Sequence, residues 1–70
     1  MTTSELVVTA IVNQAVNEYE IVNQSFETVR NDIFNTIISE QDYRLAKHIK
    51  SAGRAFVLNY ISDTLRKKGV

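Results

Sequence analysis

Apolar residues recur along the first half of the chain at alternating spacings of four and three. They fall at Val8, Val12, Ala15, Tyr19, Val22, Phe26, Val29 and Ile33. Such spacing is the heptad seam of an α-helix, and it continues for about three and a half heptads. Several of the residues in between are β-branched, which also suits strands, but the unbroken period favours a helix. The pattern predicts a seam for self-association, to which Phe56, Tyr60 and Ile61 contribute from the second half of the chain.

Three local signals predict where helices begin and end. Thr2 stands three residues before Glu5, the spacing of a capping box. A second start is predicted at Ser39, with acidic residues in the first turn at Glu40 and Asp42. The cations 66–68 precede Gly69, a combination typical of a helix C-terminus. Because proline is absent and glycine occurs only twice, long helices are expected between these signals.

A single helix over residues 4–38 would be about 50 Å long, too long for a compact chain of this size. Either it breaks near 23–25, or it belongs to an extended hairpin that pairs with another chain. Segments 6–12 and 33–38 are apolar on nearly every side, which predicts cover from a second subunit. We therefore expect one all-α domain over 1–70, a long helical hairpin or a three- or four-helix bundle, completed by homo-oligomerisation with a dimer favoured.

Residues 43–54 form a predicted basic amphipathic helix, with apolar and basic side chains on opposite arcs. Beyond Gly53 the apolar direction changes, toward Val57, Leu58, Ile61 and Leu65. Either Gly53 breaks the helix, or one helix passes between two layers of an oligomer. A helix-turn-helix fits the spacing around Gly53, but its second helix would be mostly apolar, which argues against contact with base edges.

Charge divides the chain into an acidic half and a basic half. Residues 1–43 carry seven acids and one arginine, a net charge of −6, and residues 44–70 carry the reverse, +6. The basic half is predicted to bind nucleic acid or an acidic partner through Tyr43, Arg44, Lys47, Lys50, Arg54, Arg66, Lys67 and Lys68. Its cations can equally complement the acidic half, or form a merely solvated surface. Tyr43 is the aromatic that could stack or anchor, whereas Tyr19 and Tyr60 are expected in the core.

Candidate chemistry is sparse. Cysteine is absent, which excludes disulfides and thiolate ligands, and the single histidine, His48, is expected on a solvated polar face. No glycine-rich phosphate loop and no coupled pair of titratable groups is visible, so no metal, cofactor or enzymatic activity is expected. A chain of 70 residues buries a marginal core, which again favours self-association. With no signal peptide or membrane span apparent, a cytoplasmic location is expected.

These observations favour a small non-enzymatic regulatory or adaptor module that acts through protein–protein association. The alternative is a nucleic-acid-binding protein that uses the basic helix 43–54 and the tail 66–68. The predicted partners are another copy of the chain and a second protein, with nucleic acid in the alternative and no membrane.

Overall fold

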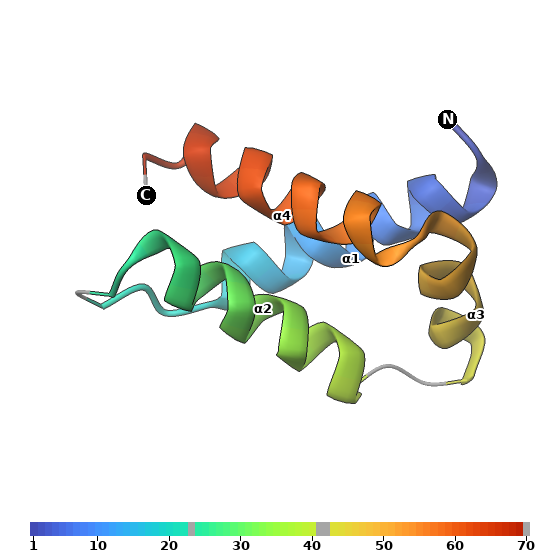
Figure 1. The fold of residues 1–70 in the computed structure, drawn as a ribbon, viewed down its shortest axis with the longest axis horizontal. Coiled ribbons are helices and arrows are strands. Elements are labelled where there is room, and N and C mark those ends of the chain that lie inside the picture. Colours follow the sequence, from blue (N-terminus) through green and yellow to red (C-terminus); the bar gives the residue numbers. More distant parts are fainter. Residues whose placement is uncertain (23, 41–42, 70) are drawn as a thin grey trace.

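The computed structural model describes residues 1–22, 24–40 and 43–69, and for Glu40 the backbone alone. The described residues form four helices and no strand: α1 (Thr3–Glu18), α2 (Phe26–Glu40), α3 (Tyr43–Ala52) and α4 (Arg54–Lys67) (Figure 1). The predicted all-α class is confirmed in its four-helix form. Within these described ranges, no helix combines the length and the apolarity that a bilayer crossing requires.

Helices α1 and α4 each contact the other three helices. Helix α4 packs against both α1 and α2, while α3 packs across one end of the bundle against α1 and the start of α4 (Figure 1). The N-terminus lies at the α3 end, and the C-terminus lies at the opposite end, beside the connection between α1 and α2 (Figure 1). The molecule therefore has two distinct ends, one made by α3 and one where the connector between α1 and α2 leaves α1 and enters α2.

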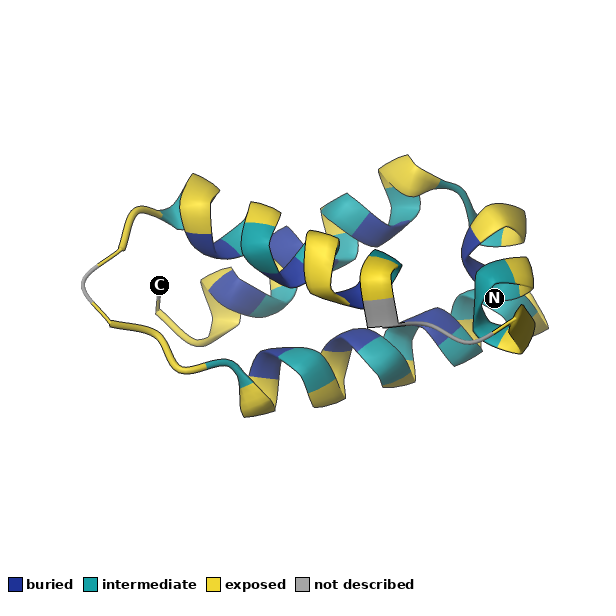
Figure 2. Ribbon diagram, turned by 90° about the horizontal axis from the view of Figure 1, so that it is seen from below, coloured by how far each residue is buried: buried dark blue, intermediate teal, exposed yellow. Residues whose placement is uncertain are grey.

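The core runs between the inward faces of all four helices (Figure 2). Ten hydrophobic side chains of the described residues are buried in it: Val8, Val12, Val16, Val29, Ile33, Ile37, Ile49, Val57, Ile61 and Leu65. On α4 the buried positions 57, 61 and 65 are one turn apart, so they form one stripe along the helix. Burial of this stripe explains the change of apolar direction beyond Gly53.

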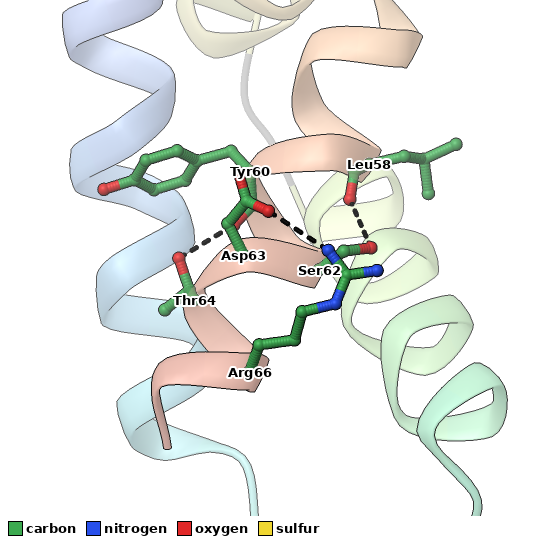
Figure 3. A network of polar contacts seen from close by, with 6 residues as sticks. All are labelled: Leu58, Tyr60, Ser62, Asp63, Thr64 and Arg66. Carbon is green, nitrogen blue, oxygen red and sulfur yellow. Dashed lines mark hydrogen bonds and ion pairs between the residues drawn. The ribbon is translucent and has the colours of Figure 1, made fainter. Parts of the chain in front are cut away.

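Two hydroxyl groups near the core are satisfied within α4 itself. Ser62 Oγ donates to the carbonyl oxygen of Leu58 at 2.9 Å, and Thr64 Oγ1 donates to that of Tyr60 at 2.8 Å (Figure 3). A buried hydroxyl without a partner is costly, and these bonds to the preceding turn avoid that cost. Neither hydroxyl therefore needs a polar partner from another helix.

A single copy of the chain reaches the dimensions of a folded monomer. Its accessible surface is 4774 Å², against about 4,500 Å² expected for a monomer of this mass. Its radius of gyration is 11.5 Å, against roughly 11 Å from chain length. Of the predicted seam residues, Val8, Val12, Val29, Ile33 and Ile61 are fully buried inside this one chain. Self-association is thus not needed to cover them, and it stays a prediction.

The heptad seam does not continue as one helix. Helix α1 ends at Glu18, and α2 begins after Ser25, whose hydroxyl accepts a hydrogen bond from the Thr28 N–H at 3.2 Å. Val22, which the pattern assigns to the helical seam, lies outside both helices and is 62% exposed; its part in self-association stays a prediction. The break predicted near 23–25 lies beside this cap, although Asn23 itself is outside the described residues.

The helix start predicted at Ser39 is also wrong. Ser39 lies inside α2, and its hydroxyl donates to the carbonyl oxygen of Thr36 at 3.2 Å. The apolar pattern of α2 continues through Ile37 and Ile38, which keeps the backbone helical past the expected start. Gln41 and Asp42, which belonged to the same signal, lie outside the described residues, as does the side chain of Glu40.

Gly53 separates α3 from α4, which decides between the two sequence interpretations in favour of a break. Its φ of 93° lies in the region that side-chain-bearing residues rarely adopt. The Gly53 N–H still donates to the Ile49 carbonyl, while its own carbonyl accepts from Val57, so it closes one helix and opens the next. The predicted C-terminus is confirmed as well, since α4 ends at Lys67 and Gly69 has a φ of 80°.

The predicted capping box at the start of α1 is confirmed. Thr2 Oγ1 accepts from the Glu5 N–H at 3.1 Å, and the Thr2 N–H donates to Glu5 Oε1 at 2.9 Å. The backbone hydrogen bond from Thr2 is the main reason that the pKa of Glu5 is lowered from its ordinary value. Because the folded pKa is depressed, this stabilisation is present above the ordinary pKa of glutamate and is lost as the pH falls.

Replacing Thr2 with alanine is expected to lower the free energy of unfolding by about 0.5–2 kcal/mol, the usual cost of losing an N-cap side chain. Thr3→Ala is the matched control, because Thr3 is exposed in the first turn of α1 and alanine suits a helix at least as well. Urea denaturation monitored by circular dichroism measures both. Equal unfolding midpoints for the two variants would show that the cap contributes nothing.

Candidate binding face on helix α3

Helix α3 presents a basic surface to solvent, as the sequence predicts. Ile49 is buried, and Leu45, Ala46 and Ala52 are half-buried on the same side of the helix. On the opposite side lie the exposed residues Tyr43, Arg44, Lys47 and Lys50, followed by the exposed Arg54 at the start of α4. We call these five residues the α3 basic face. The face exists because apolar and basic residues alternate at helical spacing, so packing the apolar side against α1 turns the cations outward.

Tyr43 is the most accessible aromatic of this face. Its side chain is 89% exposed at the first residue of α3. Lys47 and Lys50 follow it four and seven residues later, so the three side chains lie along one side of the helix. A tyrosine combines a large apolar ring with a hydroxyl, which makes it a common anchor in binding interfaces.

A shallow hollow of about 370 Å³ adjoins the basic face where α2, α3 and α4 meet. It is lined by Ile38, Ala46, Ile49, Lys50 and Arg54. Two of its five lining residues are cations of the α3 basic face, and the other three are apolar. This arrangement suits an anionic ligand that also offers an apolar group.

The cations of the α3 basic face are not neutralised within the described part of the chain. None of Arg44, Lys47, Lys50 and Arg54 forms an ion pair with a described carboxylate, whereas Arg66 lies 3.3 Å from Asp63. Four like charges on neighbouring turns produce a positive potential that attracts anionic ligands, and salt weakens it.

The C-terminal cations do not join this face. Arg54 and Arg66 mark opposite ends of α4, about 18 Å apart along the helix at ~1.5 Å per residue. Arg66 pairs with Asp63 (Figure 3) and lies over the Phe26 ring, 5.5 Å from its centroid. Lys68 Nζ donates to Asn17 Oδ1 at 2.8 Å. Two of the three tail cations therefore tie α4 to α2 and α1, and Lys67 stays exposed.

The expectation for His48 is wrong in one respect. The residue is half-buried, and its Nδ1 forms a hydrogen bond with Ser4 Oγ at 3.0 Å. His48 thus links α3 to the first turn of α1 instead of belonging to a purely solvated face. The contact joins residues 44 positions apart, and local sequence pattern carries no signal for it.

Tyr19 and Tyr60 both pack against the core, as expected. Tyr60 lies stacked with Phe56 at a centroid distance of 6.4 Å, and its hydroxyl is 3.2 Å from Asn13 Nδ2. Tyr19 donates from its hydroxyl to Asp32 Oδ2 at 2.8 Å, and this hydrogen bond is the main cause that raises the pKa of Tyr19. Both tyrosines therefore hold helices together.

A second concave site, absent from the sequence predictions, lies between α1 and α2. This α1–α2 groove of about 390 Å³ is lined by Ile11, Gln14, Ala15, Glu18, Tyr19, Ile33, Thr36, Ile37 and Leu45. Gln14, Glu18 and Thr36 of this lining lie off the predicted seam. The groove forms where α1, α2 and the first turn of α3 meet. No periodicity in the sequence marks it.

Comparison with known proteins adds no family to this description: no family model, no curated protein and no solved structure matches the chain. Across the described ranges, no group of three or more His, Cys, Asp or Glu residues is placed to hold a metal ion. The chemistry that α3 offers is the binding of anions beside an exposed aromatic ring.

Proposed function

We propose that this protein is a non-enzymatic helical adaptor whose α3 basic face docks an acidic segment of a protein partner. The observation that carries the proposal is the set of exposed cations on one side of α3 that pair with no described carboxylate, with Tyr43 exposed among them. Electrostatic complementarity of this kind speeds encounter and sets the orientation of a partner.

The apolar hollow beside Lys50 and Arg54 favours a protein segment over a phosphate backbone. Ile38, Ala46 and Ile49 line it, and they can receive an apolar side chain that a nucleic-acid backbone does not offer. The tail cations, which would extend a phosphate-binding track, lie at the other end of α4 and are partly engaged within the chain. An acidic peptide that also carries a leucine fits both features.

The test uses a fluorescently labelled peptide of several glutamates around one leucine, and a second peptide with glutamines in place of the glutamates. We expect the acidic peptide alone to bind. Lys47→Glu combined with Lys50→Glu should lower the affinity for the acidic peptide at least about tenfold, equivalent to ~1.4 kcal/mol, because two attractive contacts become repulsive. Fluorescence anisotropy measures the affinity, and circular dichroism confirms that the variant is folded.

The single variant Lys47→Glu is also measured, and Lys67→Glu is its charge-matched control. Lys67 is also exposed on a helix and carries the same charge, but it lies at the far end of α4. It should leave peptide binding nearly unchanged.

A short DNA duplex is titrated in parallel. Were the duplex to bind while the peptide does not, with a log–log salt slope of about −3 to −4 for four phosphate contacts, nucleic-acid binding would replace this proposal. Failure of both ligands to bind at low salt would also overturn it.

A further inference from the structure

The α1–α2 groove has an apolar interior and an acidic rim. Ile11, Ala15, Ile33 and Ile37 supply apolar surface from the two helices. Glu18 lines the groove and is exposed, with its Oε1 accepting from Gln14 Nε2 at 3.2 Å. Asp32 lies beside the groove through its hydrogen bond with Tyr19, and the exposed Glu20 follows Tyr19 in the connector.

The charge of the rim selects the kind of side chains that fit. Among the residues that line the groove, Glu18 is acidic and none is a lysine or arginine. An apolar or aromatic side chain flanked by cations therefore complements both the apolar interior of the groove and the carboxylate at its rim. Burial of the ring removes apolar surface from water, and the flanking cations meet carboxylates at the rim.

The chain itself carries such a combination on α3. Tyr43 projects an almost fully exposed ring, with Lys47 and Lys50 along the same side of the helix. The same chain cannot place this side in its own groove. Leu45 of α3 already lines the groove, and Lys47 is about 200° from Leu45 around the helix axis at ~100° per residue.

We propose that the α3 basic face of one copy docks in the α1–α2 groove of a second copy, with Tyr43 in the groove and Lys47 at the Glu18 rim. The inference deepens the proposed function, since it names a second copy as one acidic partner of the same face. The two surfaces are complementary in charge, because the groove lining carries a carboxylate and no lysine or arginine, whereas the α3 basic face carries four cations and no carboxylate. The contact joins two different surfaces, so it either closes into a ring or continues as a chain of copies.

The first measurement is the mass of the wild-type protein by sedimentation and light scattering at low salt, up to about 1 mM so that a millimolar Kd would still be seen. We expect the average mass to rise above the 8.0 kDa of one chain as concentration increases, and to fall again in molar salt. Tyr43→Ala should weaken the association at least tenfold without a loss of helix, because the side chain is exposed.

Charge reversal separates head-to-tail docking from other modes of association. Glu18→Lys alone and Lys47→Glu alone should each abolish self-association, since each variant sets like charges at the contact. The double variant Glu18→Lys with Lys47→Glu should recover it, and so should an equimolar mixture of the two single variants. Glu27→Lys and Lys67→Glu are the matched controls, because both side chains are exposed and neither lines the groove or the α3 basic face.

The outcomes keep this inference distinct from the proposed function. A wild-type chain that stays monomeric at about 1 mM while still binding the acidic peptide would overturn the docking in a second copy and leave the adaptor function standing. Self-association that survives both single reversals would also overturn it, because another surface would then be responsible. Recovery in the double variant and in the mixture supports the pairing of Lys47 with Glu18.

Discussion

Replacing Ile61 with alanine is expected to lower the free energy of unfolding by about 2–5 kcal/mol, the usual range for truncating a fully buried isoleucine. Ile61 is 0% exposed on α4, the helix that packs against both α1 and α2. The change removes apolar surface from the core and leaves a cavity that rigid helices fill only partly. For a chain of 70 residues, total stability is roughly 4–10 kcal/mol, so much of the fold is at risk.

Urea denaturation followed by circular dichroism gives the value directly. The matched control is Leu6→Ala, because Leu6 is a similar side chain that is 56% exposed on α1. Its effect should stay within about 0.5 kcal/mol. A loss below about 1 kcal/mol for Ile61→Ala would mean that this position is not enclosed as described.

The same experiment tests whether the core belongs to one chain. At low micromolar concentration, the unfolding midpoint should not change as the protein is diluted, since Val12, Ile33 and Ile61 are buried without a second copy. Had these seam residues been shared between subunits, dilution would lower the midpoint by mass action. A midpoint that depends on protein concentration in that range would show that the seam residues are shared between copies, as the sequence predicts.

Local chemistry in the sequence predicts the start of α1 and the end of α4, and it gives a break at Gly53 as one of two alternatives. The capping box at Thr2, the break at Gly53 and the terminal Gly69 each depend on residues within one turn. The signal at Ser39 fails because a serine with acids after it also occurs inside a helix. What decides there is the apolar stripe of Ile33 and Ile37, which is buried in the core and leads α2 up to the signal, so Ser39 falls in the last turn of that helix.

The heptad pattern identifies core residues well but does not say what covers them. Val12 and Ile33 are both on the predicted seam, and both are buried, yet in two antiparallel segments of one chain. Periodicity specifies which side of a helix is apolar and not what covers it. The pattern also crosses Val22 without a change of spacing, although Ser25 provides the cap that starts a new helix.

The α3 basic face could be predicted because it lies on one helix. Whether Arg66 and Lys68 are engaged within the chain could not be judged from sequence, since that depends on what each side chain contacts in the fold. The contacts that engage the tail, with Asn17 and Phe26, join residues far apart along the chain. The α1–α2 groove is hidden for the same reason, as its shape follows from the approach of α1, α2 and α3.

Replacing Gly53 with alanine is expected to lower the free energy of unfolding by about 1–3 kcal/mol. A Cβ at this position would have no heavy atom within 4 Å, so the cost is not steric contact with neighbouring groups. It comes from the backbone, whose φ of 93° and ψ of 146° place Gly53 in a region that alanine rarely adopts. Gly69→Ala is the matched control, because Gly69 also has a positive φ and open space but lies beyond the last helix.

The two glycine variants also connect stability to binding. If alanine forces residue 53 out of its conformation, α3 and α4 change their relative direction, and Lys50 and Arg54 no longer flank the same hollow. Gly53→Ala should therefore lower the affinity for the acidic peptide, measured by fluorescence anisotropy at temperatures where the variant is folded. Gly69→Ala should leave that affinity unchanged. A Gly53→Ala protein with unchanged stability and unchanged affinity would show that the turn between α3 and α4 does not depend on glycine. Loss of stability with full affinity would separate the turn from the α3 basic face, because the cations would then act through α3 alone.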